Sequence, residues 1–390
     1  GQPVGGLLSS TAVRVGLAVV LVAAIGGVAA TQLGVMGGSD GAGTSDAVEQ
    51  VPDGVTGVAR FDPGVLDDSV ATELYAEAYE ATANATDRES DGGTTTTATP
   101  GMAVSPRASV PSNLTAVRER IENQTGLDPG AADEVVAFWN APENATGEQY
   151  GGVIVHADWN ESAFKRAVAE SAPVRYENAT VAGKRVYRPS SGGGDEDALT
   201  APSPDWIGVL GDGEYVVGTE AAVTDAIRVS AGNESSLDGD LLSTYSETED
   251  GYLRYAVKSP STNVTRINET YGAFTGMNVT KYGEAYNDLY VVAGSYYTTD
   301  SGLGSETRIR TNETDTAKDV RDLIQGAISI NAGAVQNETL ERQLRSTEVN
   351  RDGTTVTVTR ETSIEAMIEI FRWYRSIMDP EEMRMPSSVV

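Results

Sequence analysis

Cysteine is absent from this 390-residue chain, which excludes disulfide bridges, thiolate nucleophiles, zinc–thiolate sites and iron–sulfur clusters. Histidine occurs once, as His156, two residues before Asp158. One imidazole cannot by itself hold a metal, and a general base needs a nucleophile or substrate proton beside it. We therefore interpret His156 as a partly exposed strand-end residue and expect no catalytic residue, cofactor or metal.

Positive charge is also scarce, with 28 Lys and Arg against 57 Asp and Glu and a formal net charge of −29. The five lysines are Lys165, Lys184, Lys258, Lys281 and Lys318. Nucleic acid is excluded as a partner because binding its backbone requires clustered Lys and Arg.

The strong acidity does not predict disorder, because 39% of the residues are hydrophobic and follow strand and helix patterns. A folded surface with this charge repels itself unless salt screens it. The Debye length falls to about 3 Å in molar salt, so concentrated salt relieves the repulsion. Abundant Asp and Glu with little Lys resembles the proteins of salt-loving archaea.

No P-loop, Gly-x-Ser-x-Gly or His-Glu-x-x-His sequence occurs. Acidic groups such as Asp62 with Asp67 and Asp68, or Asp238 with Asp240, suggest a glycosidase pair or a cation site. With 57 carboxylates such groupings are expected everywhere, so we interpret them as solvated surface. The sequence Gly211-Asp212-Gly213 lies between two strand patterns and predicts a hairpin turn, not a dinucleotide loop.

One long apolar run, residues 15–36, follows Arg14 and precedes a Gly- and Ser-rich segment. A helix of this length crosses about 30 Å of hydrocarbon, and the positive flank stays in the cytoplasm. We predict a cytoplasmic N-terminus at 1–14, a transmembrane helix at 15–36 that contacts the lipid bilayer, and a flexible tether at 37–50. The alternative is a signal peptide cleaved after Val28-Ala29-Ala30.

Asn-x-Ser/Thr, the acceptor motif for N-glycosylation, is the strongest motif signal. It occurs at 12 of the 16 asparagines, whereas chance alone places a hydroxyl two residues on for about 3 of them. The predicted acceptors are Asn84, Asn113, Asn123, Asn144, Asn160, Asn178, Asn233, Asn263, Asn268, Asn278, Asn312 and Asn337. The alternative explanation is that Asn and Thr are common in turns and helix caps.

The remaining pattern predicts an α+β fold with two similar modules, 51–235 and 245–380, each an antiparallel sheet covered by helices. A Thr-rich stretch at about 84–111 predicts a long exposed loop inside the first module. Strands are predicted at 55–62, 134–140, 151–157, 251–258, 288–299 and 305–312, with strand pairs in 174–188, 206–218 and 345–361. Helices are predicted at 65–83, 160–171, 220–229, 261–276, 314–330 and 363–378.

The segments VPDGVTGVARFDPG, YGGVIVHADWNESAFKRAV, AGKRVYR and WIGVLGDGEYVVGTEAAVTDAIRVSAGNESSL, with the later GYLRYAV, resemble an uncharacterised family of exported, membrane-anchored bacterial and archaeal domains. The likeness covers most of residues 51–260 and is one of pattern. It implies a fold and a location, and no activity.

These observations predict a surface glycoprotein of a halophilic archaeon, a non-enzymatic envelope or interaction module whose partner is an envelope or membrane protein. Two alternatives remain open. A carboxylate-based hydrolase of surface polymers requires two converging carboxylates in a cleft. A solute-binding receptor requires an apolar cleft between the modules. The apolar stripe of the C-terminal helix, from Ile364 to Met378, predicts packing on the protein's own core or contact with a partner or membrane surface.

Overall fold

The computed structural model describes residues 47–87, 111, 113–140, 150–171, 175–190, 205–259, 289–300 and 302–378. The predicted N-terminal segment 1–14, the membrane helix 15–36 and most of the tether lie outside these residues, as do the predicted helix 261–276 and most of the loop 84–111. Among the helices of the described ranges, none combines the length and the apolar character that crossing a bilayer requires.

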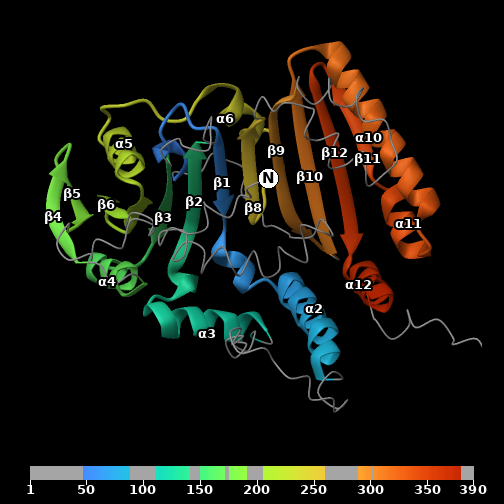
Figure 1. The fold of residues 1–390 in the computed structure, drawn as a ribbon, viewed down its shortest axis with the longest axis horizontal. Helices are drawn as coiled ribbons and strands as arrows, with labels where there is room; N and C mark the ends of the chain where they lie inside the picture. The colour runs from blue at the N-terminus through green and yellow to red at the C-terminus, as the bar shows by residue number, and fades with distance from the viewer. Residues whose placement is uncertain are drawn as a thin grey trace, which may run out of the picture.

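The described residues form an α+β fold built on one antiparallel sheet of 12 strands (Figure 1). The strands are β1 (Gly57–Phe61), β2 (Ala132–Asn140), β3 (Tyr150–Ala157), β4 (Tyr176–Val181), β5 (Lys184–Pro189), β6 (Trp206–Gly211), β7 (Glu214–Gly218), β8 (Leu253–Lys258), β9 (Leu289–Thr299), β10 (Gly302–Thr311), β11 (Glu348–Asp352) and β12 (Thr355–Ser363). Their order across the sheet is β11-β12-β10-β9-β8-β1-β2-β3-β7-β6-β5-β4.

The expectation of a separate sheet in each module is corrected by the pairing of β1 with β8. This ladder joins strands β1–β7 of the first predicted module to strands β8–β12 of the second. Val58 of β1 and its partner Ala256 of β8 are both fully buried. Pairing of the two strands therefore helps to bury their apolar side chains. Continuous pairing also removes two sheet edges that separate modules would expose.

The two halves of the sheet follow the same strand order. Outward from the seam, the first half runs β1, β2, β3, β7, β6 and the second runs β8, β9, β10, β12, β11. In each half a helix follows the third strand: α4 (Glu161–Ser171) follows β3, and α10 (Thr314–Ala334) follows β10. The hairpin β4–β5 extends the first half and has no counterpart among the described strands of the second.

Helices cover the two faces of the sheet unequally. On one face, here the α5 face, the core joins Val58, Val136 and Ile154 of the strands to three helical segments. These are η2 (Val48–Gln50), α5 (Glu220–Ser230) and α6 (Gly239–Ser246). Ala47 and Val48 are buried members of this cluster. The folded core therefore begins within residues 37–50, which were predicted to be a flexible tether.

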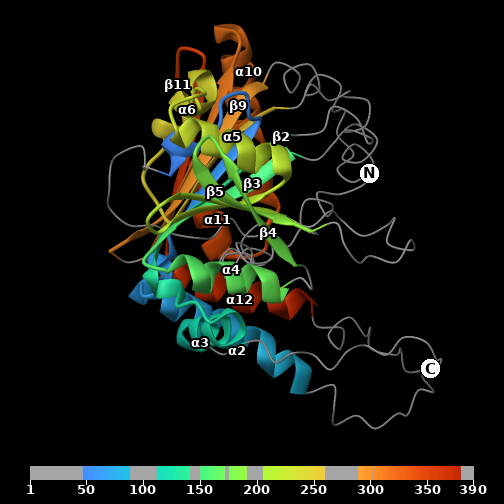
Figure 2. The same cartoon turned by 90° about the vertical axis from the view of Figure 1, so that its left-hand side faces the viewer.

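The opposite face, here the α4 face, packs against the remaining helices (Figure 2). They are η3 (Pro63–Leu66), α2 (Ser69–Asp87), α3 (Leu114–Thr125), α4, α10 and α12 (Ile364–Met378), with α11 (Glu338–Arg345) beside α10 and η4 (Pro129–Ala131) before β2. In α12, Met367 is buried with Leu74 and Leu303, so the start of its apolar stripe packs on the protein itself.

Local sequence signals account for most of these elements. Gly213 has φ +76° in the β6–β7 hairpin, which confirms the predicted turn. The hydroxyl of Thr219 accepts a hydrogen bond from the amide of Ala222 and begins α5. Helix α3 was not predicted, although Asn113 caps it and Gly126 ends it with φ +69°.

Candidate functional site

The residues singled out for catalysis have structural partners. His156 lies on β3 with Nε2 3.4 Å from Oε1 of Gln50, and Asp158 is exposed beyond the strand end. No hydroxyl or thiol nucleophile is paired with this imidazole among the described residues. The geometry of a nucleophile and its base, which acyl transfer needs, is not formed at His156.

The acidic groups Asp62, Asp67 and Asp68 do not converge on a common point. Asp62 accepts a hydrogen bond from the amide of Gly64 and caps η3. Asp67 pairs with Arg118 at 3.2 Å, and Asp68 accepts from the amide of Ala71 at 2.8 Å. Burial raises the pKa of Asp62, while its hydrogen bond and Arg60 oppose the rise.

The second acidic pair is divided in the same way. Asp240 pairs with Arg310 at 2.9 Å, whereas Asp238 occupies the N-cap position of α6 without a side-chain cap bond. In the described part of the chain, no group of three or more metal-ligating side chains comes together.

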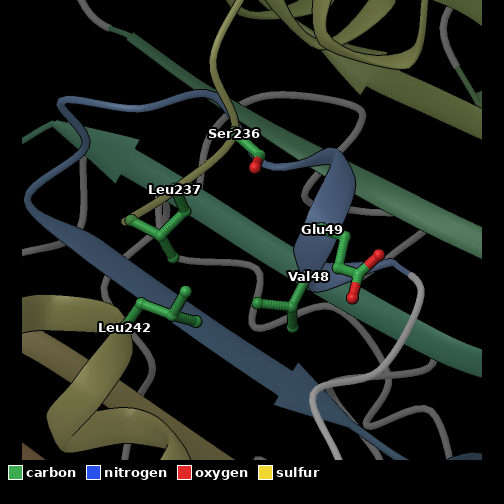
Figure 3. Close-up of a pocket in the computed structure, with 5 residues that line it drawn as sticks. All are labelled: Val48, Glu49, Ser236, Leu237 and Leu242. Carbon is green, nitrogen blue, oxygen red and sulfur yellow. The ribbon is translucent and has the colours of Figure 1, made fainter. Parts of the chain in front are cut away.

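A small hollow of about 260 Å³ lies between η2, the chain entering α6, and α6 itself (Figure 3). Its lining is Val48, Glu49, Ser236, Leu237 and Leu242. Pockets for small molecules typically enclose about 300–1,000 Å³ and present several polar groups that converge on the ligand. This hollow is smaller and offers one carboxylate, that of the exposed Glu49.

The strongest electrostatic feature is a charge network on the α5 face at the seam of the two halves. Arg60 of β1 and Arg254 of β8 are direct cross-strand partners. Like charges in directly opposite positions destabilise a sheet. Asp250 relieves the repulsion because its Oδ1 accepts from both guanidinium groups at 3.4 Å.

Each arginine of this seam network has further partners. Arg60 Nε donates to Oε1 of Glu134 at 2.5 Å, and Glu134 Oε2 also accepts from the amide of Ala47 at 3.3 Å. Arg254 is 3% exposed and donates to Tyr245 O at 2.9 Å and to Thr248 O at 3.1 Å. Its guanidinium lies 4.6 Å from the centre of the Tyr245 ring.

The network holds the two halves of the sheet and η2 together, and its geometry does not favour proton transfer. The carboxylates of Glu134 and Asp250 are both paired with arginines. Tyr245 is completely buried, its hydroxyl has no hydrogen-bond partner in the described structure, and burial raises its pKa. The side chains of Arg60 and Asp250 are 190 residues apart in the sequence, and the network joins the two halves to η2.

Sequence analysis missed this network, although a signal was present. Arg60 and Arg254 each interrupt a strand that is otherwise apolar, in GVARF and LRYAV. A charged side chain on the buried face of such a strand needs a partner of opposite charge. Which acidic residue supplies it depends on the strand pairing.

The predicted glycosylation sites with described side chains lie at the surface. Six of these seven asparagines are exposed and one is half-buried, Asn337. The exposed ones are Asn113, Asn123, Asn160, Asn178, Asn233 and Asn312. The side chain of Asn84, in α2, and the whole of Asn144, Asn263, Asn268 and Asn278 lie outside the described part.

Three of the acceptors also begin helices through the side-chain oxygen. The Oδ1 of Asn113, Asn160 and Asn337 accepts a backbone hydrogen bond at 2.8, 2.9 and 2.7 Å, respectively. An N-linked sugar is attached to the amide nitrogen and leaves this oxygen free to accept. Capping and glycosylation at these positions are therefore chemically compatible.

No protein-family model and no curated protein match this chain. Crystal form III of TP0453 is similar with a TM-score of 0.40 and 8% identity, over 85% of this chain and 99% of that one. Crystal form I of TP0453 gives a TM-score of 0.38 at the same identity, over 85% and 98% of the two chains.

Proposed function

We propose that this chain is the N-glycosylated ectodomain of a membrane-anchored surface protein of a halophilic archaeon, serving as a non-enzymatic envelope or interaction module. Residues 15–36 anchor it in the bilayer, and the two similar halves face the exterior. The resemblance to exported domains and the charge of −29 support this location.

The observation that carries the proposal is the exposure of the acceptor asparagines. A glycan is bulky and hydrophilic, so its asparagine must be reachable and must open into solvent. Six of the seven acceptors with described side chains meet this requirement fully. They come from α3, from the starts of α3 and α4, from β4, and from the segments after α5 and β10, so sugars would surround the body on several sides.

The use of arginine in the surface ion pairs supports a protein that is adapted to high salt. In the ion pairs recorded between described residues the cation is arginine, as in Arg118 with Asp128 at 2.8 Å and Arg185 with Glu161 at 2.7 Å. Its planar guanidinium is more weakly hydrated than a lysine ammonium and contacts carboxylates with two nitrogens. The hydrogen bonds and charge of Arg118 lower the pKa of Asp128.

Glycopeptide mass spectrometry of the protein purified from its native membranes tests the proposal. We expect glycans on several of the exposed acceptors, among them Asn160 and Asn233, which are exposed next to helices. A complete set of unmodified peptides would contradict the surface-glycoprotein function.

A further inference from the structure

The 12-stranded sheet ends in two different edge strands, β11 and β4. An edge strand presents unpaired N–H and C=O groups that can pair with a strand of another molecule. Proteins prevent this with charged side chains or by covering the edge with a helix or loop. The β11 and β4 edges differ in how they are protected from such pairing.

The β11 edge is protected by charge and by a helix. Glu348, Arg351 and Asp352 are exposed along its five residues, so most of the strand carries charge. Helix α10 also packs against β11. Asn350, in the middle of this strand, is not followed by Ser or Thr two residues on and is no acceptor.

The β4 edge carries less charge than the β11 edge within the described structure, although α5 contacts β4 as α10 contacts β11. Its one charged residue, Glu177, is paired at 3.1 Å with Arg188 of the neighbouring strand β5. The rest of the strand is uncharged and includes Thr180 and Val181, which have high β-propensity. Such a strand is a template for pairing with a second copy of itself.

Asn178 is exposed in the third of the six positions of β4, and Thr180 completes its acceptor motif. A strand added to the edge would lie about 4.8 Å from β4. The Asn178 side chain leaves one face of the strand, so a bulky sugar chain rooted there would extend over the position of an added strand and hinder its approach.

We propose that an N-linked glycan on Asn178 covers the free edge of the sheet and prevents β4 from pairing with β4 of a second copy. This inference rests on the proposed function, since it requires the chain to be glycosylated. A glycan at Asn178 gives β4 the protection that three exposed charged side chains give β11.

Two substitutions of Thr180 separate the sugar from the side chain. Thr180→Ala removes the acceptor motif, while Thr180→Ser keeps it and also loses the methyl group. We expect the full glycosylated chain and its Thr180→Ser variant to be monomeric in detergent by size-exclusion chromatography with light scattering. The Thr180→Ala variant should have twice the protein mass, with slowed hydrogen exchange at the β4 amides.

A second pair of measurements does not depend on the folding of a Thr180 variant. Enzymatic removal of the glycans from the folded wild-type chain should double its protein mass. When the chain is produced without glycosylation, the Asn178→Lys variant should be monomeric, because a lysine on an edge strand opposes pairing with a second copy. Asn312→Gln removes a glycan after β10, in the other half of the sheet, and should leave the mass unchanged.

The outcomes distinguish this inference from the proposed function. An unmodified Asn178 in a chain glycosylated elsewhere would overturn the inference alone, and so would a monomeric chain after deglycosylation. A native chain without any glycan would overturn both.

Discussion

Replacing Glu134 with Gln tests whether the seam network fastens the two halves. Glu134 is 5% exposed, and its carboxylate accepts from Arg60 Nε at 2.5 Å and from the amide of Ala47 at 3.3 Å. Glutamine keeps the shape but loses the charge, and if its oxygen faces Arg60 its NH₂ group faces the Ala47 amide. Two donors then oppose each other.

Removing one partner of a buried pair costs about 3–5 kcal/mol when the other charge is left without compensation. Arg60 retains Asp250 at 3.4 Å and the Gly251 carbonyl at 3.2 Å, so we expect about 2–3 kcal/mol. For a domain of this size that loss lowers the melting temperature by roughly 3–6 °C.

The matched control is Glu341→Gln. Glu341 pairs with Arg345 at 2.8 Å on the exposed side of α11, with 37% of the Glu341 side chain exposed. Exposed helical pairs of this kind contribute about 0.3–0.5 kcal/mol, and salt screens them. Chemical unfolding at two NaCl concentrations at which the protein is folded should therefore separate the two variants, with the effect of Glu134→Gln persisting at the higher one. Equal effects of the two substitutions would refute a structural role for the network.

Four further outcomes are expected. The native protein should retain residues 15–36 by mass spectrometry, and a mature N-terminus at Thr31 would contradict the anchor. Circular dichroism should show loss of structure as salt is diluted, because the charge of −29 is then unscreened, and equal stability in molar and millimolar NaCl would contradict this. Burial raises the pKa of Tyr176 and Tyr255 to about 12, whereas tyrosine in an unfolded chain ionises near pH 10. The stability that these two tyrosines contribute is therefore complete below about pH 10 and is lost as the pH rises toward 12. Tyrosinate absorbance should show a higher midpoint in the native than in the denatured chain, and coincident midpoints would exclude the shift. Gly304→Ala should lower the free energy of unfolding in urea by about 1–3 kcal/mol, because the new methyl group meets the ring of its cross-strand partner Tyr297. The control Gly326→Ala, on the open side of α10, should not lower it. A larger loss for Gly326→Ala than for Gly304→Ala would contradict the packing.

Much of the local structure was predictable from the sequence. The alternation in WIGVLGDGEYVVG, with Gly211-Asp212-Gly213 between its halves, predicted β6, β7 and their turn. Apolar residues at helical spacing predicted α5 and α10 within a few residues at each end. These signals lie within one short window of chain, so neighbouring residues are enough to produce them. The acceptor motif is equally local, which is why all 12 positions were visible in the sequence.

Only the tertiary structure decided how the halves join. The pairing of β1 with β8 unites segments almost 200 residues apart, and it places Arg60 opposite Arg254 with Asp250 between them. No local pattern selects that register, because it depends on which distant strand buries the same apolar face and supplies the opposite charge. The exposure of Asn178 on a free edge is likewise a property of the strand order, since the same six residues in the middle of the sheet would have a neighbour on both sides.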